Sequence, residues 1–586
     1  MATDKIRKYL LPNIPYLFIG WFCLKIGTAY RLAAGAGFGE KLLGLGQTIG
    51  AAFASFDPGL VPFDWLVGIV GAAAFRLLIY FKSKNAKKFR RDAEYGTARW
   101  GNEKDIKPFV DPKFENNMIL TATERLTMNT RPKNPANARN LNFCGIGSSG
   151  SGKTRFWLTP QLLQAHSSYV VVDPKGSVLG QVGAFLQRRG YQIKVFNSID
   201  FSKSMHYNPL SYIRNEADIL KFVNALITNT KGEGKEGDPF WTKAETLLYC
   251  ALIAYIIFEG PAEDRNMNTL VDMISGMEVK EDDENYKNAV DYMFDGLAKR
   301  KPDCFAVKQY RKFKLSSGKT AKSILVSAAV RLAPFNLPQI KAVTDHDDMD
   351  LYTLGERKCA LYAVIPDNDT TFTFLVSLLY SQIFQTLYYC ADQIHHGALP
   401  CHVHFILDEA PSGNLPGLPR ELATMRSRNI SCSTIIQNMA QIKELYKDSW
   451  ETIPGNSDTL LYLGGNEAST HKYISEALGK STIGTKTHGQ TKGRSGSYST
   501  NFQMSGRELL TPDEVRMLDN RYCILFIRGT QPVMDEKYEL MEHPAIRYTM
   551  DGGGPPYIHH GTAEPPIPGK PLFQTDFDNE KENAAA

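Results

Sequence analysis

The sequence predicts an α/β protein that is split by an inserted all-helical domain and preceded by a two-helix transmembrane anchor. Three observations lead to this fold class. Two apolar stretches lie near the N-terminus, a glycine-rich loop follows a short apolar run, and a second apolar run ends in the acids Asp408 and Glu409. From Lys153 in the loop to Asp408 the chain runs 255 positions (408 − 153), far more than one strand–helix–strand unit needs. A further domain is therefore expected between the two motifs.

Length and composition are those of a multidomain globular protein. The 586 residues exceed what one compact core holds. Hydrophobic residues make up 43% and charged residues 22%, which excludes a mostly disordered, collagen-like or coiled-coil chain. Because 67 Lys and Arg nearly balance 62 Asp and Glu, any nucleic-acid-binding surface is expected to be local. Nine cysteines without CxxC spacing indicate buried thiols in a reducing compartment.

Residues 1–92 are predicted to form the membrane anchor, with transmembrane helices at about 14–34 and 63–81. The first stretch is interrupted by Lys25, which we expect to face another helix. The link between the spans is expected to be a short external loop, about 35–61. A cleaved signal peptide is disfavoured because no small-residue cleavage site follows the first stretch and a second span does. A cationic cluster after the second span predicts a multi-pass protein of the cell membrane with both termini in the cytoplasm: Lys82, Lys84, Lys87, Lys88, Arg90 and Arg91.

The glycine-rich loop matches G-x-x-x-x-G-K-[ST], the pattern of a phosphate-binding loop. A buried strand is predicted before it at 141–146 and a helix after it at 155–164. Glycines let the backbone N–H groups turn towards phosphates, Lys153 is expected to reach the β and γ phosphates, and the Thr154 hydroxyl is expected to ligate Mg²⁺. ATP and Mg²⁺ are thus the predicted cofactors. The predicted nucleotide-binding residues are Gly147, Ser148, Ser149, Gly150, Ser151, Gly152, Lys153 and Thr154.

Two acids stand at the tip of a second predicted strand, 404–407. Asp408 is expected to hold the Mg²⁺ ion together with Thr154, and Glu409 to polarise the attacking water. A lone apolar run followed by Asp-Glu is a moderate signal, but its combination with the glycine loop is a strong one.

A third predicted strand, 431–436, ends in Gln437 and follows two arginines. Gln437 is expected to sense the γ-phosphate, and Arg426 to reach the nucleotide of a neighbouring subunit as an arginine finger, ahead of Arg428. The alternative is that both arginines are solvated helix charges.

Changes in composition divide the rest of the chain. Strands at 168–172 and 192–196 belong to the same sheet as the glycine loop, and a strand at 358–365 resumes it. The Ser/Thr/Gly-rich segment 481–507 is expected to be a mobile loop or a pore-facing excursion. After the anchor, the predicted domains are 93–215 and 341–545 for the two parts of the nucleotide-binding domain, 216–340 for the all-helical domain, and 546–586 for a disordered tail.

Two local groups of side chains have open interpretations. Between Lys308 and Lys322 six Lys or Arg and no acid accompany Tyr310 and Phe313, which fits either a DNA phosphate contact or an ordinary solvated helix face. Packing is favoured over a metal site for His395, His396, His402 and His404.

Together the motifs resemble those of the type IV secretion coupling proteins, the TraG/TraD-like ATPases of conjugative DNA transfer. The resemblance runs from the N-terminal hairpin to about residue 530. The chain departs from the family pattern at Ser177, where the family usually carries Glu. Besides the glycine loop, the matching segments are Asp173-Pro-Lys-Gly176, Asn208-Pro-Leu210, Asp238-Pro-Phe-Trp241 with Glu245, Leu407-Asp-Glu-Ala410, Met425-Arg-Ser-Arg428, Ile436-Gln-Asn438, Gln441-Ile-Lys-Glu-Leu-Tyr446 and Leu509-Leu-Thr-Pro-Asp-Glu-Val515.

The resemblance implies a RecA-like nucleotide domain and a homo-hexamer around a channel. The leading hypothesis is a membrane-anchored hexameric ATPase that couples ATP hydrolysis to transfer of single-stranded DNA with its relaxase. The implied partners are the relaxosome and the components of the type IV secretion channel. Two alternatives stay open: a coupling protein for protein effectors only, and a cargo receptor that does not hydrolyse ATP.

Overall fold

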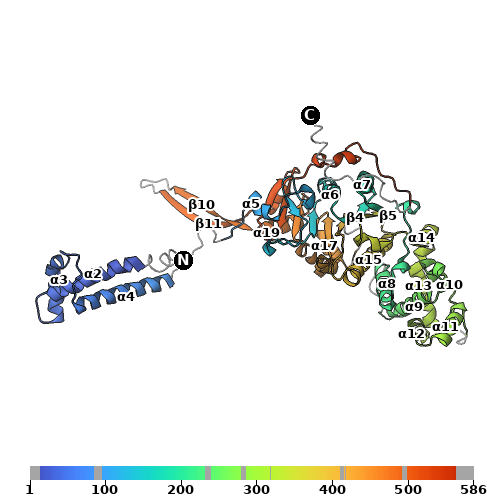
Figure 1. The fold of residues 1–586 in the computed structure, drawn as a ribbon, viewed down its shortest axis with the longest axis horizontal. Helices are drawn as coiled ribbons and strands as arrows, with labels where there is room; N and C mark the ends of the chain where they lie inside the picture. The colour runs from blue at the N-terminus through green and yellow to red at the C-terminus, as the bar shows by residue number, and fades with distance from the viewer. Residues whose placement is uncertain are drawn as a thin grey trace. The chain divides into compact units, whose positions relative to one another are not determined.

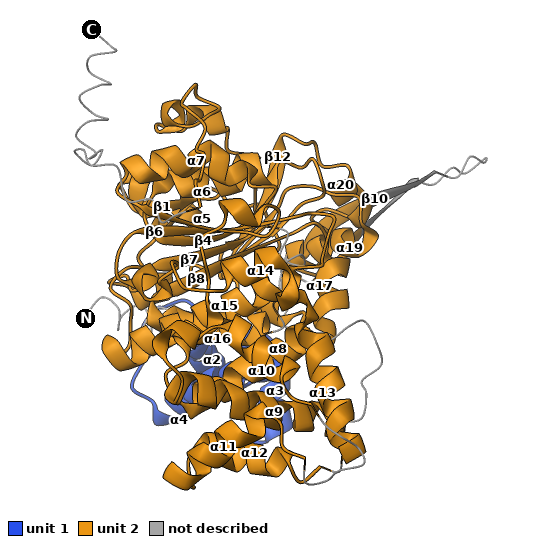
Figure 2. Cartoon of the chain, turned by 90° about the vertical axis from the view of Figure 1, so that its right-hand side faces the viewer, with its two compact units in different colours: residues 1–94 blue, residues 95–586 orange. Residues whose placement is uncertain are grey.

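The computed structural model describes residues 13–84, 95–230, 239–278, 286–316, 318–408, 415, 417–490 and 498–561. The chain forms two compact units, residues 1–94 and 95–586 (Figure 2).

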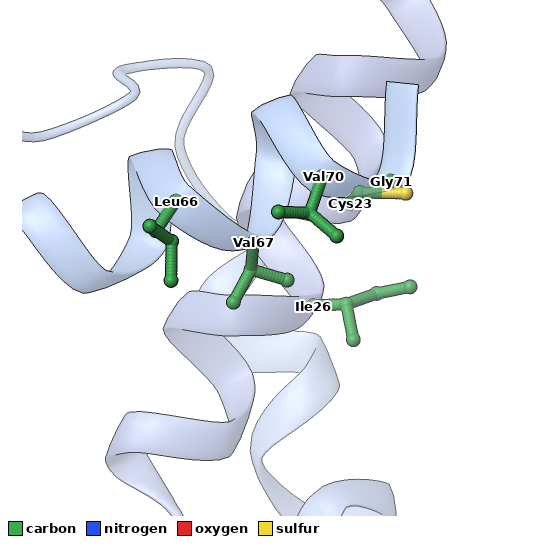
Figure 3. A pocket seen from close by; sticks show the side chains of 6 residues that line it. All are labelled: Cys23, Ile26, Leu66, Val67, Val70 and Gly71. Atoms are coloured by element: carbon green, nitrogen blue, oxygen red, sulfur yellow. The ribbon is translucent and has the colours of Figure 1, made fainter. Parts of the chain in front are cut away.

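Unit 1 is built from helices that pack through small residues. Its helices are α2 (Ile14–Leu32), α3 (Phe38–Ala52) and α4 (Pro62–Lys84). The helices α2 and α4 approach closely, because a Cβ atom at Gly68 would meet the Gly20 carbonyl and one at Gly71 would meet Cys23. A shallow apolar hollow remains between them, as Figure 3 shows. Its lining residues are Cys23, Ile26, Leu66, Val67, Val70 and Gly71.

The charged side chains of α2 find partners within unit 1. Buried Lys25 donates a hydrogen bond of 2.5 Å from Nζ to the Asp57 carbonyl. Arg31 lies 3.2 Å from the buried carboxylate of Asp64, which also accepts from the Thr28 hydroxyl at 2.9 Å. Lys25 therefore contacts the segment before α4 rather than the face of another helix.

The expected external loop at 35–61 is wrong for its first half, because it contains α3. The Gly- and Ala-rich composition favoured a loop, but the Glu40 carboxylate accepts the main-chain N–H groups of Ala36 and Gly37 at the helix start. The Thr48 hydroxyl then donates to the Ala29 carbonyl at 2.7 Å, which joins α3 to α2.

Two of the described helices are long and apolar enough to cross a membrane. One lies in α4, over Pro62–Lys82, at the position of the second predicted span. The other is α9 (Pro239–Phe258), which is mostly buried inside unit 2, as is usual for the core helix of a globular domain.

Unit 2 is organised by a nine-stranded sheet with the order β13-β12-β9-β3-β8-β7-β4-β6-β5. All neighbours from β9 to β5 pair in parallel, and β12 and β13 continue the sheet antiparallel. The strands predicted from the sequence at 168–172, 192–196, 358–365 and 431–436 are confirmed. The strands are β3 (Phe143–Ile146), β4 (Ser168–Pro174), β5 (Gln192–Asn197), β6 (Cys359–Ile365), β7 (Val403–Leu407), β8 (Ile430–Ile436), β9 (Thr459–Tyr462), β12 (Tyr522–Ile527) and β13 (Val533–Glu536).

Helices cover both faces of this sheet. Along β4, Tyr169 and Val171 belong to one core with the helices α6 (Thr159–Gln164) and α7 (Ser177–Arg188), whereas Val170 and Val172 belong to the core of α15 (Thr373–Tyr389) and α17 (Met439–Tyr446). The α6 and α7 ribbons lie on the opposite side of the sheet from α15 (Figures 1 and 2). The alternation follows from the period of two along a strand that is buried on both faces.

The all-helical insertion stands between β5 and β6, which are neighbours in the sheet. Buried α9 lies at its centre, and Glu245 on α9 accepts from Arg331 Nε on α13 at 2.8 Å. Its helices are α8 (Glu216–Asn229), α9, α10 (Met267–Ser275), α11 (Ala289–Arg300), α12 (Phe305–Phe313), α13 (Gly318–Leu332) and α14 (Pro338–Val343).

The described part of segment 481–507 is regular β structure, which corrects the expectation of a mobile loop and leaves that of a pore-facing excursion untested. It belongs to an antiparallel hairpin of β10 (Lys480–Gln490) and β11 (Tyr498–Glu508), a separate sheet in which Lys480 pairs with Glu508 and Gln490 with Tyr498. The segment is rich in Ser and Thr and lacks the alternation of apolar and polar residues that predicts a strand. Continuous main-chain pairing joins the two strands.

The expectation of disorder from residue 546 onwards is wrong for the residues described up to 561. Tyr557 is buried, donates its main-chain N–H to the Gly180 carbonyl on α7 at 2.9 Å, and packs against Gly183. Residues 562–586 lie outside the described part of the chain.

The remaining α-helices and β-strands of unit 2 are α5 (Glu103–Ile106), β1 (Asn117–Ile119), β2 (Arg125–Thr127), α16 (Leu418–Thr424), α18 (Thr452–Gly455), α19 (Ala468–Leu478) and α20 (Pro512–Arg516).

Candidate functional site

The glycine loop leaves the carboxyl end of β3 at the middle of the sheet. Gly147 donates its N–H to the Ile436 carbonyl at 3.0 Å, so the loop starts against the tip of β8. A Cβ atom at Gly147 would collide with the Ser151 hydroxyl, and Gly150 and Gly152 adopt φ values of +79° and +84°. Glycine is therefore required at these positions by close approach and by backbone conformation.

The Lys153 side chain folds back over the loop. Its ammonium donates to the main-chain carbonyls of Gly147 at 2.8 Å and Ser148 at 3.2 Å. The Ser151 hydroxyl is buried and has no hydrogen-bond partner among the described residues. A cation and a buried hydroxyl beside turned-in amides form a cradle that fits a phosphate group.

Asp408 reaches the same place from β7. Only β8 lies between β3, which leads into the glycine loop, and β7, which leads to Asp408. The carboxyl ends of these two strands are therefore close together on the same side of the sheet. Thr154 Oγ1 donates to Asp408 Oδ2 at 3.2 Å, and Asp408 is only 5% exposed. A hydroxyl and a carboxylate oxygen together form the hard donor set that Mg²⁺ prefers.

A second buried acid, Asp173, stands at the tip of the neighbouring strand β4. Its carboxylate accepts the main-chain N–H groups of Val178 at 3.2 Å and Leu179 at 2.7 Å, which caps α7. Burial, together with the nearby charge of Asp408, raises the pKa of Asp173 to about 7. The Asp173-Pro-Lys-Gly176 motif thus connects a capped helix to the acidic edge of the site.

The other predicted site residues lie at different places around this centre. Gln437 follows β8 directly, and its main-chain N–H donates to Gln441 Oε1 at 3.1 Å. Arg426 lies in a 3₁₀ turn before β8, Met425–Arg428, where its Nη2 contacts the Thr130 carbonyl at 3.4 Å. Arg428 instead pairs with Asp392 at 2.7 Å. Glu409 lies outside the described residues.

Sequence reasoning missed a lysine at the glycine loop. Lys537, just after β13, is 7% exposed and donates from Nζ to the Ser151 carbonyl at 2.9 Å and to Asn520 Oδ1 at 2.7 Å. Burial lowers the pKa of Lys537. Because 386 positions separate it from Ser151, no local pattern could have indicated this contact.

The basic segment on α12 and α13 contributes no stacking platform. Tyr310 and Phe313 are buried, and the Tyr310 ring stacks on Phe294 with centroids 3.9 Å apart. The Tyr310 hydroxyl donates to Asp291 at 2.9 Å. Both rings are therefore occupied by the core of the helical insertion, which favours the interpretation of this segment as a solvated helix face.

A glycine loop and a strand-tip acid on a parallel sheet define the class of P-loop nucleotide-binding proteins. Solved structures of similar fold narrow the class. The unbound conjugative coupling protein TrwBdeltaN70 has a TM-score of 0.53 at 16% identity, over 78% of this chain and 97% of that one. TrwB in complex with the non-hydrolysable ATP analogue ADPNP has a TM-score of 0.53 at 15% identity, over 78% of this chain and 96% of that one. The fold is thus a RecA-like nucleotide domain with an inserted helical domain.

Sequence relatives identify the family. Residues 111–546 match the family "Type IV secretory system Conjugative DNA transfer", so the chain belongs to this family of coupling proteins. VirD4 of Rhizobium radiobacter is 24% identical over 448 residues, which cover 74% of this chain and 61% of that protein. VirD4 of Bartonella henselae is 22% identical over 526 residues, 83% of this chain and 79% of that protein. The chain spans less than two thirds of the length of VirD4 from Rhizobium radiobacter and from Agrobacterium fabrum, at 61% and 59%.

Proposed function

We propose that this protein is a membrane-anchored hexameric ATPase that couples ATP hydrolysis to the transfer of single-stranded DNA, with its attached relaxase, through a type IV secretion channel. The observation that carries the proposal is the 3.2 Å contact between Thr154 and Asp408, which joins the glycine loop to a strand-tip acid. The cytoplasmic placement of unit 2 rests on the basic residues that follow the second span.

The residues of the loop are assigned to phosphate binding. Lys153 moves from the loop carbonyls to the β and γ phosphates, and the main-chain amides of Gly152, Lys153 and Thr154 donate to phosphate oxygens. Thr154 and Asp408 would hold Mg²⁺, which neutralises the phosphate charge when bound. Their hydroxyl and carboxylate oxygens fit that ion. TrwB, which has a similar fold, has been solved in complex with ADPNP and with ADP and Mg²⁺, which supports ATP and Mg²⁺ as the bound groups.

Glu409 follows Asp408 directly and is assigned to accept a proton from the attacking water. Gln437 follows β8, the strand between the glycine loop and the two acids. Its assigned role is to respond to loss of the γ-phosphate and to pass that change to α17 through its hydrogen bond with Gln441. The role of Gln437 rests on its place directly after β8, and that of Glu409 on its place in the sequence next to Asp408.

Arg426 is assigned to the site of a neighbouring subunit. It precedes the amino end of β8, whereas the phosphate site lies at the carboxyl ends of the strands. Seven residues at ~3.3 Å each place Arg426 about 20 Å from its own chain's site. At that distance Arg426 does not reach its own chain's nucleotide, so its assigned role requires a nucleotide held by another copy.

The proposal is tested on the full chain in detergent by DNA-stimulated ATP hydrolysis. Lys153→Ala and Glu409→Gln should each lower kcat about 100-fold or more. Lys472→Ala, an exposed lysine on α19, is the matched control and should keep wild-type turnover. Unchanged turnover in both site variants would overturn the assignment.

The nature of the cargo needs a separate measurement. Binding of labelled single strands should weaken steeply with salt, because neutralised phosphates release counterions. Salt-independent or absent binding would favour a coupling protein for protein effectors only. Single-turnover hydrolysis separates a motor from a receptor that only holds ATP.

A further inference from the structure

We propose that His206, His346 and Asp348 form a binding site for a divalent transition-metal ion of the Zn²⁺ type, at the neck that joins the helical insertion to the nucleotide domain. His206 lies on the segment that leads from β5 to the insertion, and the other two residues lie on the segment that returns from α14 to β6. The ion would tie together the two segments through which the chain enters and leaves the insertion.

The backbone already holds the two neck segments side by side. Tyr207 donates its N–H to the Val343 carbonyl at 2.7 Å, and Asp348 donates its N–H to the His206 carbonyl at 3.0 Å. The three side chains are therefore presented from a paired, hydrogen-bonded scaffold rather than from independent loops.

The three candidate ligand atoms converge. The His206 and His346 nitrogens and an Asp348 oxygen all lie within 4.8 Å of one another. His206 Nδ1 is 2.8 Å and His346 Nε2 is 3.5 Å from Asp348 Oδ2. Ligands ~2.0–2.2 Å from a tetrahedral ion lie roughly 3.3 Å apart, close to the two separations from Asp348, and the two stacked rings must swing apart for both nitrogens to face one ion.

A fourth residue fits the role of orienting a metal-bound histidine. Asp345 Oδ2 lies 3.6 Å from His346 Nδ1, the ring nitrogen that faces away from Asp348. Metal-binding histidines usually give their second N–H to a carboxylate, which fixes the ring and raises its basicity. The His346 ring also stacks on His206 with centroids 3.9 Å apart.

The donor set selects the class of ion. Two imidazoles and one carboxylate suit Zn²⁺ and its neighbours in the first transition row, whereas Mg²⁺ prefers oxygen ligands. The site is therefore distinct in chemistry from the oxygen donors of Thr154 and Asp408. With three protein ligands, a water completes the tetrahedron.

The test is a Co²⁺ titration of the full, chelator-treated chain in detergent, purified with an affinity tag that contains no histidine. Wild-type protein should give the visible absorption of tetrahedral Co²⁺ with one ion per chain, and Zn²⁺ should displace it. His346→Asn, at a position that is 55% exposed on its side chain, and Asp348→Asn should each weaken binding at least tenfold.

Two controls make the result specific. His395→Asn removes a histidine that pairs with Glu356 at 2.5 Å and for which the described residues supply no third ligand, so it should keep the Co²⁺ signal. Asp408→Asn alters the proposed nucleotide site and should also keep the signal, which separates this inference from the proposed ATPase.

A second readout tests the structural role. Zn²⁺ should slow amide hydrogen exchange in peptides that contain Tyr207 and Asp348 in the wild type but not in His346→Asn. Absence of a tetrahedral Co²⁺ signal in the wild type, or an equal signal in His346→Asn and Asp348→Asn, would overturn the proposal. An ion that binds without slowing exchange at the neck would overturn its tying role.

Discussion

Lys537 Nζ lies 2.9 Å from the main-chain carbonyl of Ser151, so a strand from the far edge of the sheet reaches the glycine loop. The lysine is buried and its remaining described polar partner is Asn520. The contact restrains one peptide group of the loop in the conformation that turns its amides inwards.

Lys537→Met should therefore weaken nucleotide binding more than it slows chemistry. Loss of a hydrogen bond from a charged donor costs ~1.5–3 kcal/mol, about a tenfold or larger rise in the KM for ATP. The measurement is steady-state ATPase against ATP concentration, with Lys472→Met as the control. A variant with unchanged KM and reduced kcat would show that the lysine acts in the chemical step instead.

The buried pair Glu245–Arg331 is expected to stabilise the helical insertion only while both partners are present. Glu245 is 1% exposed, and Arg331 also donates to the Ile227 carbonyl and the Thr230 hydroxyl of α8. Glu245→Leu should lower the free energy of unfolding by about 3–5 kcal/mol, because it leaves a buried charge unpaired.

Adding Arg331→Met to Glu245→Leu should recover much of that loss. Thermal unfolding followed by circular dichroism measures the series. Lys287→Met, in the exposed pair with Asp295, should leave the thermal midpoint close to that of the wild type and serves as the comparison. Equal losses in the single and double variants would contradict the account.

Acid should destabilise unit 2 through three desolvated histidines, of which His404 is buried and His166 and His402 are half-buried. Burial lowers the pKa of His166 to about 3, of His402 to about 4 and of His404 well below its usual value. The unfolded chain takes up protons below pH ~6.5 while the folded chain does not, so stability is complete above that pH and falls as the pH drops towards 4.

The expected loss is about 2 kcal/mol per histidine at pH 5, since each pKa unit corresponds to ~1.4 kcal/mol. Urea unfolding between pH 7.5 and pH 5 measures the slope. His404→Gln, which keeps polar groups facing Ser431 and Ser433, should remove the contribution of one proton from that slope. An unchanged slope in this variant would place the proton uptake elsewhere.

The close packing of α2 and α4 predicts where unit 1 tolerates a larger side chain. A Cβ atom at Gly71 would lie 2.7 Å from Cys23 Cβ, so Gly71→Leu should force the two helices apart and lower the stability of unit 1. Gly46→Leu on α3, whose Cβ meets no atom within 4 Å, is the matched control and should not. Thermal unfolding of the full chain in detergent measures both variants, and equal midpoints would exclude this packing.

Local pattern was sufficient for the elements that build the centre of unit 2. Apolar runs of four to seven residues predicted β4 and β6, because strands buried on both faces are mostly apolar. The strands β5 and β8 were also predicted, although Lys194 interrupts the first and three hydroxyl side chains interrupt the second. The spacing of the glycines and Lys153 predicted the glycine loop. This was possible because Gly150 and Gly152 adopt positive φ values, which few other residues can adopt.

The remaining features depend on contacts that no short segment encodes. The 480–508 hairpin is held by pairing between two polar strands, so its composition resembled that of a loop. Helix α3 depends on a cap from Glu40, and the approach of Lys537 to Ser151 depends on the order of strands at the far side of the sheet. The roles of Glu409, Arg426 and Gln437 stay predictions, since they depend on nucleotide or on a neighbouring subunit.

The position of the helical insertion has a consequence for how such proteins diversify. The whole of α8–α14 serves as the crossover between two adjacent parallel strands, β5 and β6, and β5 is the outermost strand of the sheet. A domain inserted at this point can become longer or shorter, or be replaced, without altering the strand order around the glycine loop. The helical insertion can thus change during evolution while the sheet that carries the glycine loop and Asp408 is kept.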